Sequence, residues 1–241
     1  MTTLLLLFCF ALVAFLYASV GHGGASGYLA VMALLGYAQQ FAKPDALVLN
    51  IAVSALAFYN YYRGGFFRLR DFLFLAVFSV PMAWVGGLTR LDDGVYHRLL
   101  AVMLLIAAFS VVFRPAEPKQ VRPIPIYWAA FCGASIGWIS GLTGIGGGVI
   151  LSPLLLMVGW ANQKQAAALS AAFILVNSIS GFVGWLGQNK PLDSNLIFML
   201  PVAIAGGFVG SFLGANRFQS KHLKWLLCAV LLVASIRLFI N

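Results

Sequence analysis

The stretch GLTGIGGGVILSP, residues 141–153, places five glycines within eight residues in the middle of an otherwise apolar chain. Glycine is the poorest helix former apart from proline and costs roughly 1 kcal/mol per residue relative to alanine. The run of three glycines at 146–148 therefore predicts an interrupted helix, with a new helix beginning directly after the break. A related stretch, GHGGASG, occupies residues 21–27.

The composition around these stretches is that of a membrane protein. Of the 241 residues, 62% are hydrophobic and only 9% are charged, whereas soluble domains carry about 25% charged residues. The apolar runs approach the roughly 20 residues that a spanning helix needs, so the chain is expected to be an all-α, multi-pass integral protein of the plasma (inner) membrane. The net charge of +9 comes from short loops, where basic residues set membrane orientation, and predicts no nucleic-acid partner.

Ten apolar segments are separated by charged residues, prolines and glycines. The polar stretch at 114–125 divides them five and five, which predicts an N-terminal transmembrane repeat at 1–113, a connecting loop at 114–125 and a C-terminal repeat at 126–241. The ten segments are 3–20, 28–37, 46–62, 72–90, 98–113, 126–141, 149–159, 166–187, 195–214 and 222–240.

The two halves resemble each other, which indicates an internal duplication. Further along the chain, Asn50 aligns with Asn177, and PMAWVGG at 81–87 aligns with PVAIAGG at 201–207, with spacings between 120 and 127. Six matches keep a constant spacing of 123: Gly21 with Gly144, Gly23 with Gly146, Gly24 with Gly147, Gly36 with Gly159, Tyr37 with Trp160 and Gln40 with Gln163.

The segments 28–37 and 149–159 are too short to span a membrane, because ten residues of helix reach about 15 Å and the hydrocarbon core is about 30 Å thick. Each follows a glycine cluster, so we expect a hairpin that turns at the glycines and returns on a half-helix. With two such hairpins, ten basic residues fall on one face and five on the other. The positive-inside rule favours this arrangement, which also makes the halves inverted repeats, each with a broken hairpin and three spanning helices.

The N-terminus of a half-helix that begins at a break presents unpaired N–H groups and a positive dipole end, which favours an anion. No carboxylate lies deep in a predicted span, where a cation pathway would usually place one. His22 is either a charged donor that holds the anion or couples transport to protons, or a neutral side chain that is hydrogen-bonded within the turn. The predicted substrate site contains Gly21, His22, Gly23, Gly24, Ser26, Asn50, Thr143, Gly144, Gly146, Gly147, Gly148 and Asn177.

Some of the glycines and all three cysteines have simpler explanations. Small residues every fourth position, at 133, 137 and 141 and at 206, 210 and 214, are typical of close helix packing. Neither glycine cluster has the lysine of a P-loop or the full pattern of a dinucleotide fingerprint. The three cysteines lie in apolar runs and the histidines are scattered, so neither a metal site nor a catalytic group is expected, and the chain is predicted not to be an enzyme and to need no cofactor.

The break in each half, followed by an apolar half-helix, resembles the TauE/SafE-like sulfite exporter family, also called the toluene sulfonate uptake permease family. The resemblance covers nearly the whole chain and is strongest at TGIGGGVILSPLLL, residues 143–156. It implies secondary transport of a small sulfur-containing anion such as sulfite, thiosulfate or an organosulfonate. The first half departs from the pattern, with His22 and Ala25 where the second half has Ile145 and Gly148.

The sequence therefore predicts a transporter that binds its anion at mid-membrane between two breaks and alternates access. The alternatives are a membrane-embedded scaffold or assembly protein and a transporter for a non-sulfur anion. The direction of transport, a coupling ion (proton or sodium) and assembly into homo-oligomers stay open.

Overall fold

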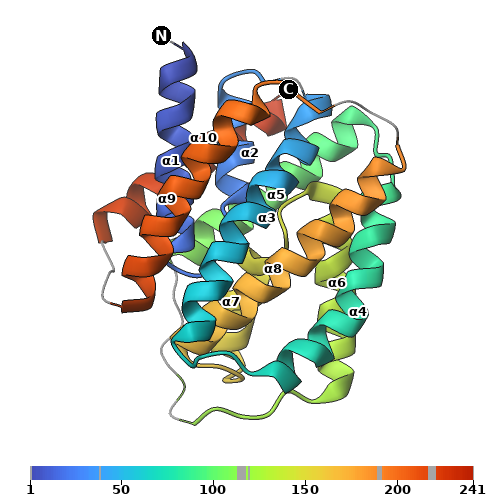
Figure 1. Cartoon of the computed structure of the whole chain (residues 1–241). Coiled ribbons are helices and arrows are strands. Elements are labelled where there is room, and N and C mark those ends of the chain that lie inside the picture. The colour runs from blue at the N-terminus through green and yellow to red at the C-terminus, as the bar shows by residue number, and fades with distance from the viewer. Residues whose placement is uncertain are drawn as a thin grey trace.

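The computed structural model describes residues 2–37, 39–112, 118, 120–188, 192–216 and 221–240. Every regular element in these ranges is a helix, and each of the ten predicted segments overlaps one of them (Figure 1). The predicted boundary between 113 and 114 and residues 114–117 and 119 of the connecting loop fall outside the described residues. The helices are α1 (Thr2–Ala18), α2 (Ala25–Leu34), α3 (Gln39–Arg63), α4 (Leu69–Leu88), α5 (Asp93–Val112), α6 (Ile126–Thr143), α7 (Gly148–Met157), α8 (Gln163–Leu186), α9 (Leu196–Asn216) and α10 (Lys221–Ile240).

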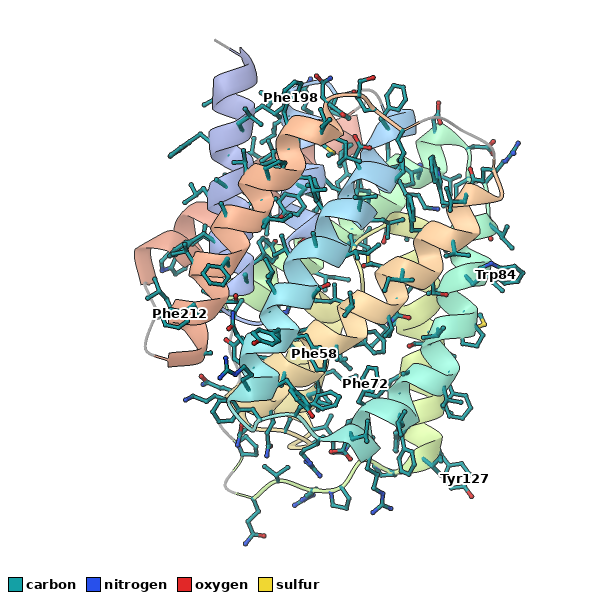
Figure 2. All side chains as sticks on the ribbon, in the orientation of Figure 1. Phe58, Phe72, Trp84, Tyr127, Phe198 and Phe212 are labelled. Carbon is teal, nitrogen blue, oxygen red and sulfur yellow. The ribbon has the colours of Figure 1, made fainter. Side chains whose placement is uncertain are left out.

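Five helices in the described ranges are long and apolar enough to cross a membrane: α3, α4, α5, α8 and α9. Large apolar side chains point outward around the bundle, among them Trp84 on α4, Tyr127 on α6 and Phe212 on α9 (Figure 2). Such a surface is stable against lipid and would be costly in water. The chain is thus a multi-pass integral membrane protein.

The half-helices α2 and α7 have ten residues each, and both their first and last residues lie 123 positions apart. They also end alike. The N–H of Tyr37 donates to the carbonyl of Met32, and the N–H of Trp160 donates to that of Leu155. The preceding residues, Gly36 and Gly159, have φ of 70° and 76°. This is the Schellman motif, which satisfies the last carbonyls of a helix. The constant spacing of 123 therefore corresponds to equal local structure.

Several boundaries differ from the expected ones. α2 begins at Ala25 rather than 28 because the helix starts directly at the break. α3 begins at Gln39 rather than 46, and its first turns contain charged residues that have partners. The hydroxyl of Tyr37 donates to Asp45 at 2.7 Å, and the ammonium of Lys43 donates to the carbonyl of Gly86 at 3.4 Å. Burial and the carboxylates of Asp193 and Asp45 raise the pKa of Tyr37, so it remains a neutral donor.

The predicted packing role of the spaced glycines is confirmed. A β-carbon on Gly133 would lie 2.6 Å from the carbonyl oxygen of Leu75 on α4, and one on Gly137 would overlap that of Ser79. On α9, β-carbons on Gly206 and Gly210 would overlap carbonyl oxygens of α1. The absence of a side chain lets the helix backbones approach closely, so α6 packs on α4 and α9 packs on α1.

The structure does not support the sequence matches that lie further along the two halves. Pro81 lies in the second half of α4, whereas Pro201 lies in the first third of α9. The alignment of 81–87 with 201–207 was therefore wrong. A Pro-and-Gly-Gly pattern recurs in many membrane helices, and it does not fix the register of one helix against another.

The halves are closely interleaved. α4 of the first half packs on α6 and α8 of the second, and α9 of the second half packs on α1 and α3 of the first. α1 begins at the end of the bundle marked N in Figure 1, whereas α6 begins at the opposite end, where Tyr127 is labelled in Figure 2. The two breaks lie inside this bundle, against α3 and α8.

Candidate functional site

The first break joins α1 to α2. The chain leaves α1 at Ala18 and reaches α2 through Gly24, whose φ of 98° and ψ of 0° are left-handed and unfavourable for residues with a side chain. Gly21 lies against α8, where a β-carbon would come within 2.5 Å of the carbonyl oxygen of Ala167. Glycine is therefore required here both by the turn and by the neighbouring helix.

The second break joins α6 to α7 and has the same form. α6 ends at Thr143, and Gly144, Gly146 and Gly147 all have positive φ, between 78° and 84°. α7 then begins at Gly148. As Gly21 does at the first break, Gly144 packs against a long helix: a β-carbon on Gly144 would lie 3.2 Å from the carbonyl oxygen of Lys43 on α3.

The side chain of Asn50, on α3, connects the two breaks. Its Oδ1 accepts from the N–H of Ala25, the first residue of α2, at 3.2 Å. Its Nδ2 donates to the carbonyl of Ile145, inside the second break, at 3.3 Å, and to the hydroxyl of Ser178 at 3.0 Å. Asn50 is fully buried, so these bonds form away from water.

Two glycines that are 123 residues apart make room for this amide. A β-carbon on Gly23 would overlap the Oδ1 of Asn50, and one on Gly146 would overlap its Nδ2. The two positions are one of the pairs spaced by 123. The close approach of both breaks to a single side chain explains why each of these positions is glycine.

His22 forms a second connection. Its Nε2 lies 3.1 Å from the carbonyl oxygen of Gly148, which can only accept, so the ring N–H donates. The ring also meets Tyr17 edge-on, with 6.2 Å between the centroids. Both a neutral and a charged imidazole ring can donate this bond, which runs to the other break rather than within its own turn.

Both breaks contain backbone N–H groups that have no acceptor among the described residues. Within the described part of the chain, the N–H groups of Gly23, Gly24, Gly146, Gly147 and Gly148 donate no hydrogen bond. Successive backbone N–H groups in a turn can form a concave anion-binding arrangement. The adjoining N-termini of α2 and α7 add the positive ends of two helix dipoles.

Other predicted site residues are occupied elsewhere. The hydroxyl of Ser26 pairs with that of Tyr17 at 2.7 Å, and the hydroxyl of Thr143 donates to the carbonyl of Ile139 at 2.8 Å. The Nδ2 of Asn177 donates to the carbonyl of Phe173 in its own helix at 2.8 Å. Their roles toward a substrate stay predictions.

Asn177 is not the structural counterpart of Asn50. The N-terminus of α2 meets Asn50, whereas the equivalent N-terminus of α7 meets Ile174: a β-carbon on Gly148 would overlap the Cδ1 of Ile174. Asn177 lies nearly one turn further along α8. The N-termini of α2 and α7 therefore have unequal neighbours, an asparagine amide at one and an isoleucine side chain at the other.

Three neighbours of the breaks were missed by sequence reasoning. Ser178 accepts from Asn50, Tyr96 donates to the carbonyl of Thr143 at 3.2 Å, and Lys43 lies against Gly144. Ser178 directly follows Asn177, so the polar pair in an apolar helix was a signal. Nothing in the local sequence points to Tyr96 or Lys43, because their proximity depends on how α5 and α3 pack.

No group of three or more His, Cys, Asp or Glu side chains in the described part of the chain could hold a metal ion. Cys9, Cys132 and Cys228 are free thiols.

Comparison with known proteins gives a consistent result. The family described as "Sulfite exporter TauE/SafE" matches residues 6–238. The chain is 34% identical, over 95% of each sequence, to the "Probable membrane transporter protein y4hK" of Sinorhizobium fredii. It is 25% identical to the "Probable membrane transporter protein YjnA" of Bacillus subtilis, over 90% of this chain and 92% of that one. These relatives are named as membrane transporters and not as enzymes, and the chain belongs to the sulfite exporter TauE/SafE family.

Proposed function

We propose that this protein is a secondary transporter for a small sulfur-containing anion, either sulfite, thiosulfate or an organosulfonate. The anion binds near mid-membrane to backbone amides of the two glycine breaks. The observation that carries this proposal is the set of unused N–H groups at Gly23, Gly24, Gly146 and Gly147, next to the polar contacts that join the breaks. The family description supports the class of substrate.

The energetics of such a site are favourable. Dehydrating an anion inside a membrane costs several kcal/mol. Hydrogen bonds to a charged group contribute about 1.5–3 kcal/mol each, so two or three aligned N–H groups offset that cost. A site without a fixed basic side chain also releases its ligand more readily, which a transporter requires. The backbone and Cγ of Lys43 lie beside Gly144, and its ammonium donates to the carbonyl of Gly86 on α4.

Transport proceeds by alternating access between two inverted repeats, residues 1–113 and 126–241. The matched lengths and ends of α2 and α7 support the duplication. The opposite directions of α1 and α6 support the inversion. Because each break contacts a long helix of the other half, rocking of one half against the other would rearrange both breaks at once.

Reconstitution into liposomes tests the proposal. Uptake of labelled sulfite, thiosulfate and methanesulfonate is measured against phosphate and nitrate, with proton and sodium gradients imposed separately to identify a coupling ion. We expect saturable uptake of at least one sulfur anion. Uptake of phosphate or nitrate alone would indicate a transporter of a non-sulfur anion. Absence of both uptake and binding for every anion would favour a scaffold.

A further inference from the structure

The phenol of Tyr28 reaches the first break with its hydroxyl unused. Tyr28 lies in the first turn of α2 and is fully buried, with its ring stacked on Phe10 at 5.1 Å between centroids. A β-carbon on Gly24 would lie 2.9 Å from the phenol oxygen, so the hydroxyl lies directly over this glycine. Its oxygen has no hydrogen-bond partner in the described part of the chain.

A buried hydroxyl without a partner is unfavourable, and native proteins rarely retain one without a reason. The second break shows that packing does not require it. At the constant spacing of 123, the residue that corresponds to Tyr28 is Leu151, which is also fully buried. A purely apolar side chain therefore fits the equivalent position after the other break.

The neighbouring hydroxyls at this break are already paired. The phenol of Tyr17 and the hydroxyl of Ser26 bond to each other at 2.7 Å. The amide of Asn50 is used by Ala25, Ile145 and Ser178. Among the described residues, Tyr28 is thus the buried hydroxyl at the first break that still has a hydrogen to donate, and it lies at a glycine whose own N–H donates no bond there.

We propose that Tyr28 is a substrate-binding and specificity-determining residue whose phenol donates a hydrogen bond to an oxygen of the transported anion. This inference rests on the proposed function. A neutral phenol beside backbone N–H groups stabilises negative charge on an oxygen without introducing a fixed positive charge. Leu151, at the corresponding position after the second break, cannot supply such a donor.

The test compares Tyr28→Phe with Tyr61→Phe in purified protein. Tyr61 is buried on α3, and its hydroxyl donates to the carbonyl of Ser19 at 3.0 Å, so this control removes a hydrogen bond internal to the protein. Titration calorimetry with sulfite, thiosulfate and methanesulfonate gives affinities, and thermal unfolding without anion gives stability.

For Tyr28→Phe we expect about a tenfold or greater weakening of anion binding, which is the loss of one bond to a charged group. Its melting temperature without anion should equal or exceed that of the wild type. Tyr61→Phe removes a bond to Ser19 at the start of the first break, so it should lower the melting temperature and weaken anion binding less than Tyr28→Phe does.

Wild-type affinity in folded Tyr28→Phe would overturn the inference and leave the proposed function standing. A fall in its anion-free melting temperature as large as that of Tyr61→Phe would also overturn it, because the hydroxyl would then be bonded within the protein. If the wild type binds none of the three anions, the proposed function is wrong and this inference fails with it.

Discussion

Gly147 is the position at which a single methyl group best tests anion binding by the backbone. Its φ of 78° and ψ of −14° are left-handed, a conformation that costs other L-residues roughly 1–2 kcal/mol. A β-carbon there would lie 2.7 Å from the Cγ2 of Ile136 and 3.0 Å from the Cε1 of Phe173. Both neighbours are buried. In Gly147→Ala the break therefore has to leave its present geometry, which turns its N–H groups away.

The size of the effect follows from the donors lost. Turning one N–H away from the anion removes a bond worth about 1.5–3 kcal/mol, which corresponds to about a 10- to 150-fold increase in Kd. We expect this loss for sulfite and thiosulfate in titration calorimetry, with a protein that still purifies as a single species. Thermal unfolding in the absence of anion measures the accompanying loss of stability.

Gly137→Ala is the matched control, on the helix that leads into the same break. Its β-carbon would overlap the carbonyl oxygen of Ser79, so α6 and α4 must separate. Overpacking of this kind typically costs about 1–3 kcal/mol of stability. The melting temperature should fall while the affinity stays unchanged. An unchanged affinity in folded Gly147→Ala would refute the reasoning and leave the glycines a packing role alone.

Three further outcomes are expected. In a cysteine-free background, Gln120→Cys should react with an impermeant reagent only from the cytoplasm and Ser194→Cys only from outside; reaction of both from one side would contradict the hairpin topology. Gly24→Ala, at φ 98°, should weaken anion binding about as much as Gly147→Ala in calorimetry, and wild-type affinity would restrict the site to the second break. Arg68→Gln should lower stability by about 2 kcal/mol in a thermal melt, because Arg68 pairs with buried Asp71 at 2.8 Å and donates to the carbonyl of Trp160; an unchanged melt would show that neither contact contributes.

The sequence by itself determined the features that depend on composition and local propensity. An apolar chain with few charges has to lie in a membrane. The dense glycine clusters at 21–24 and 144–148 strongly disfavour a continuous helix, so the breaks and the two short helices after them could be predicted from the sequence. The equal local structure at Gly36 and Gly159 followed from the spacing of 123, because a Schellman motif is specified by residues within one turn.

Tertiary structure alone decided which side chains meet at the breaks. Asn50 joins both, yet the sequence paired it with Asn177, whereas packing places Ile174 at the equivalent N-terminus. In the sequence, Tyr28 is one more residue of a short apolar helix. The packing shows that its hydroxyl is buried over Gly24 and has no hydrogen-bond partner among the described residues. The reason is register: shifting a helix by one residue turns its side chains by about 100°. Local sequence determines that a helix forms, and contacts between distant helices determine which of its faces lines the site.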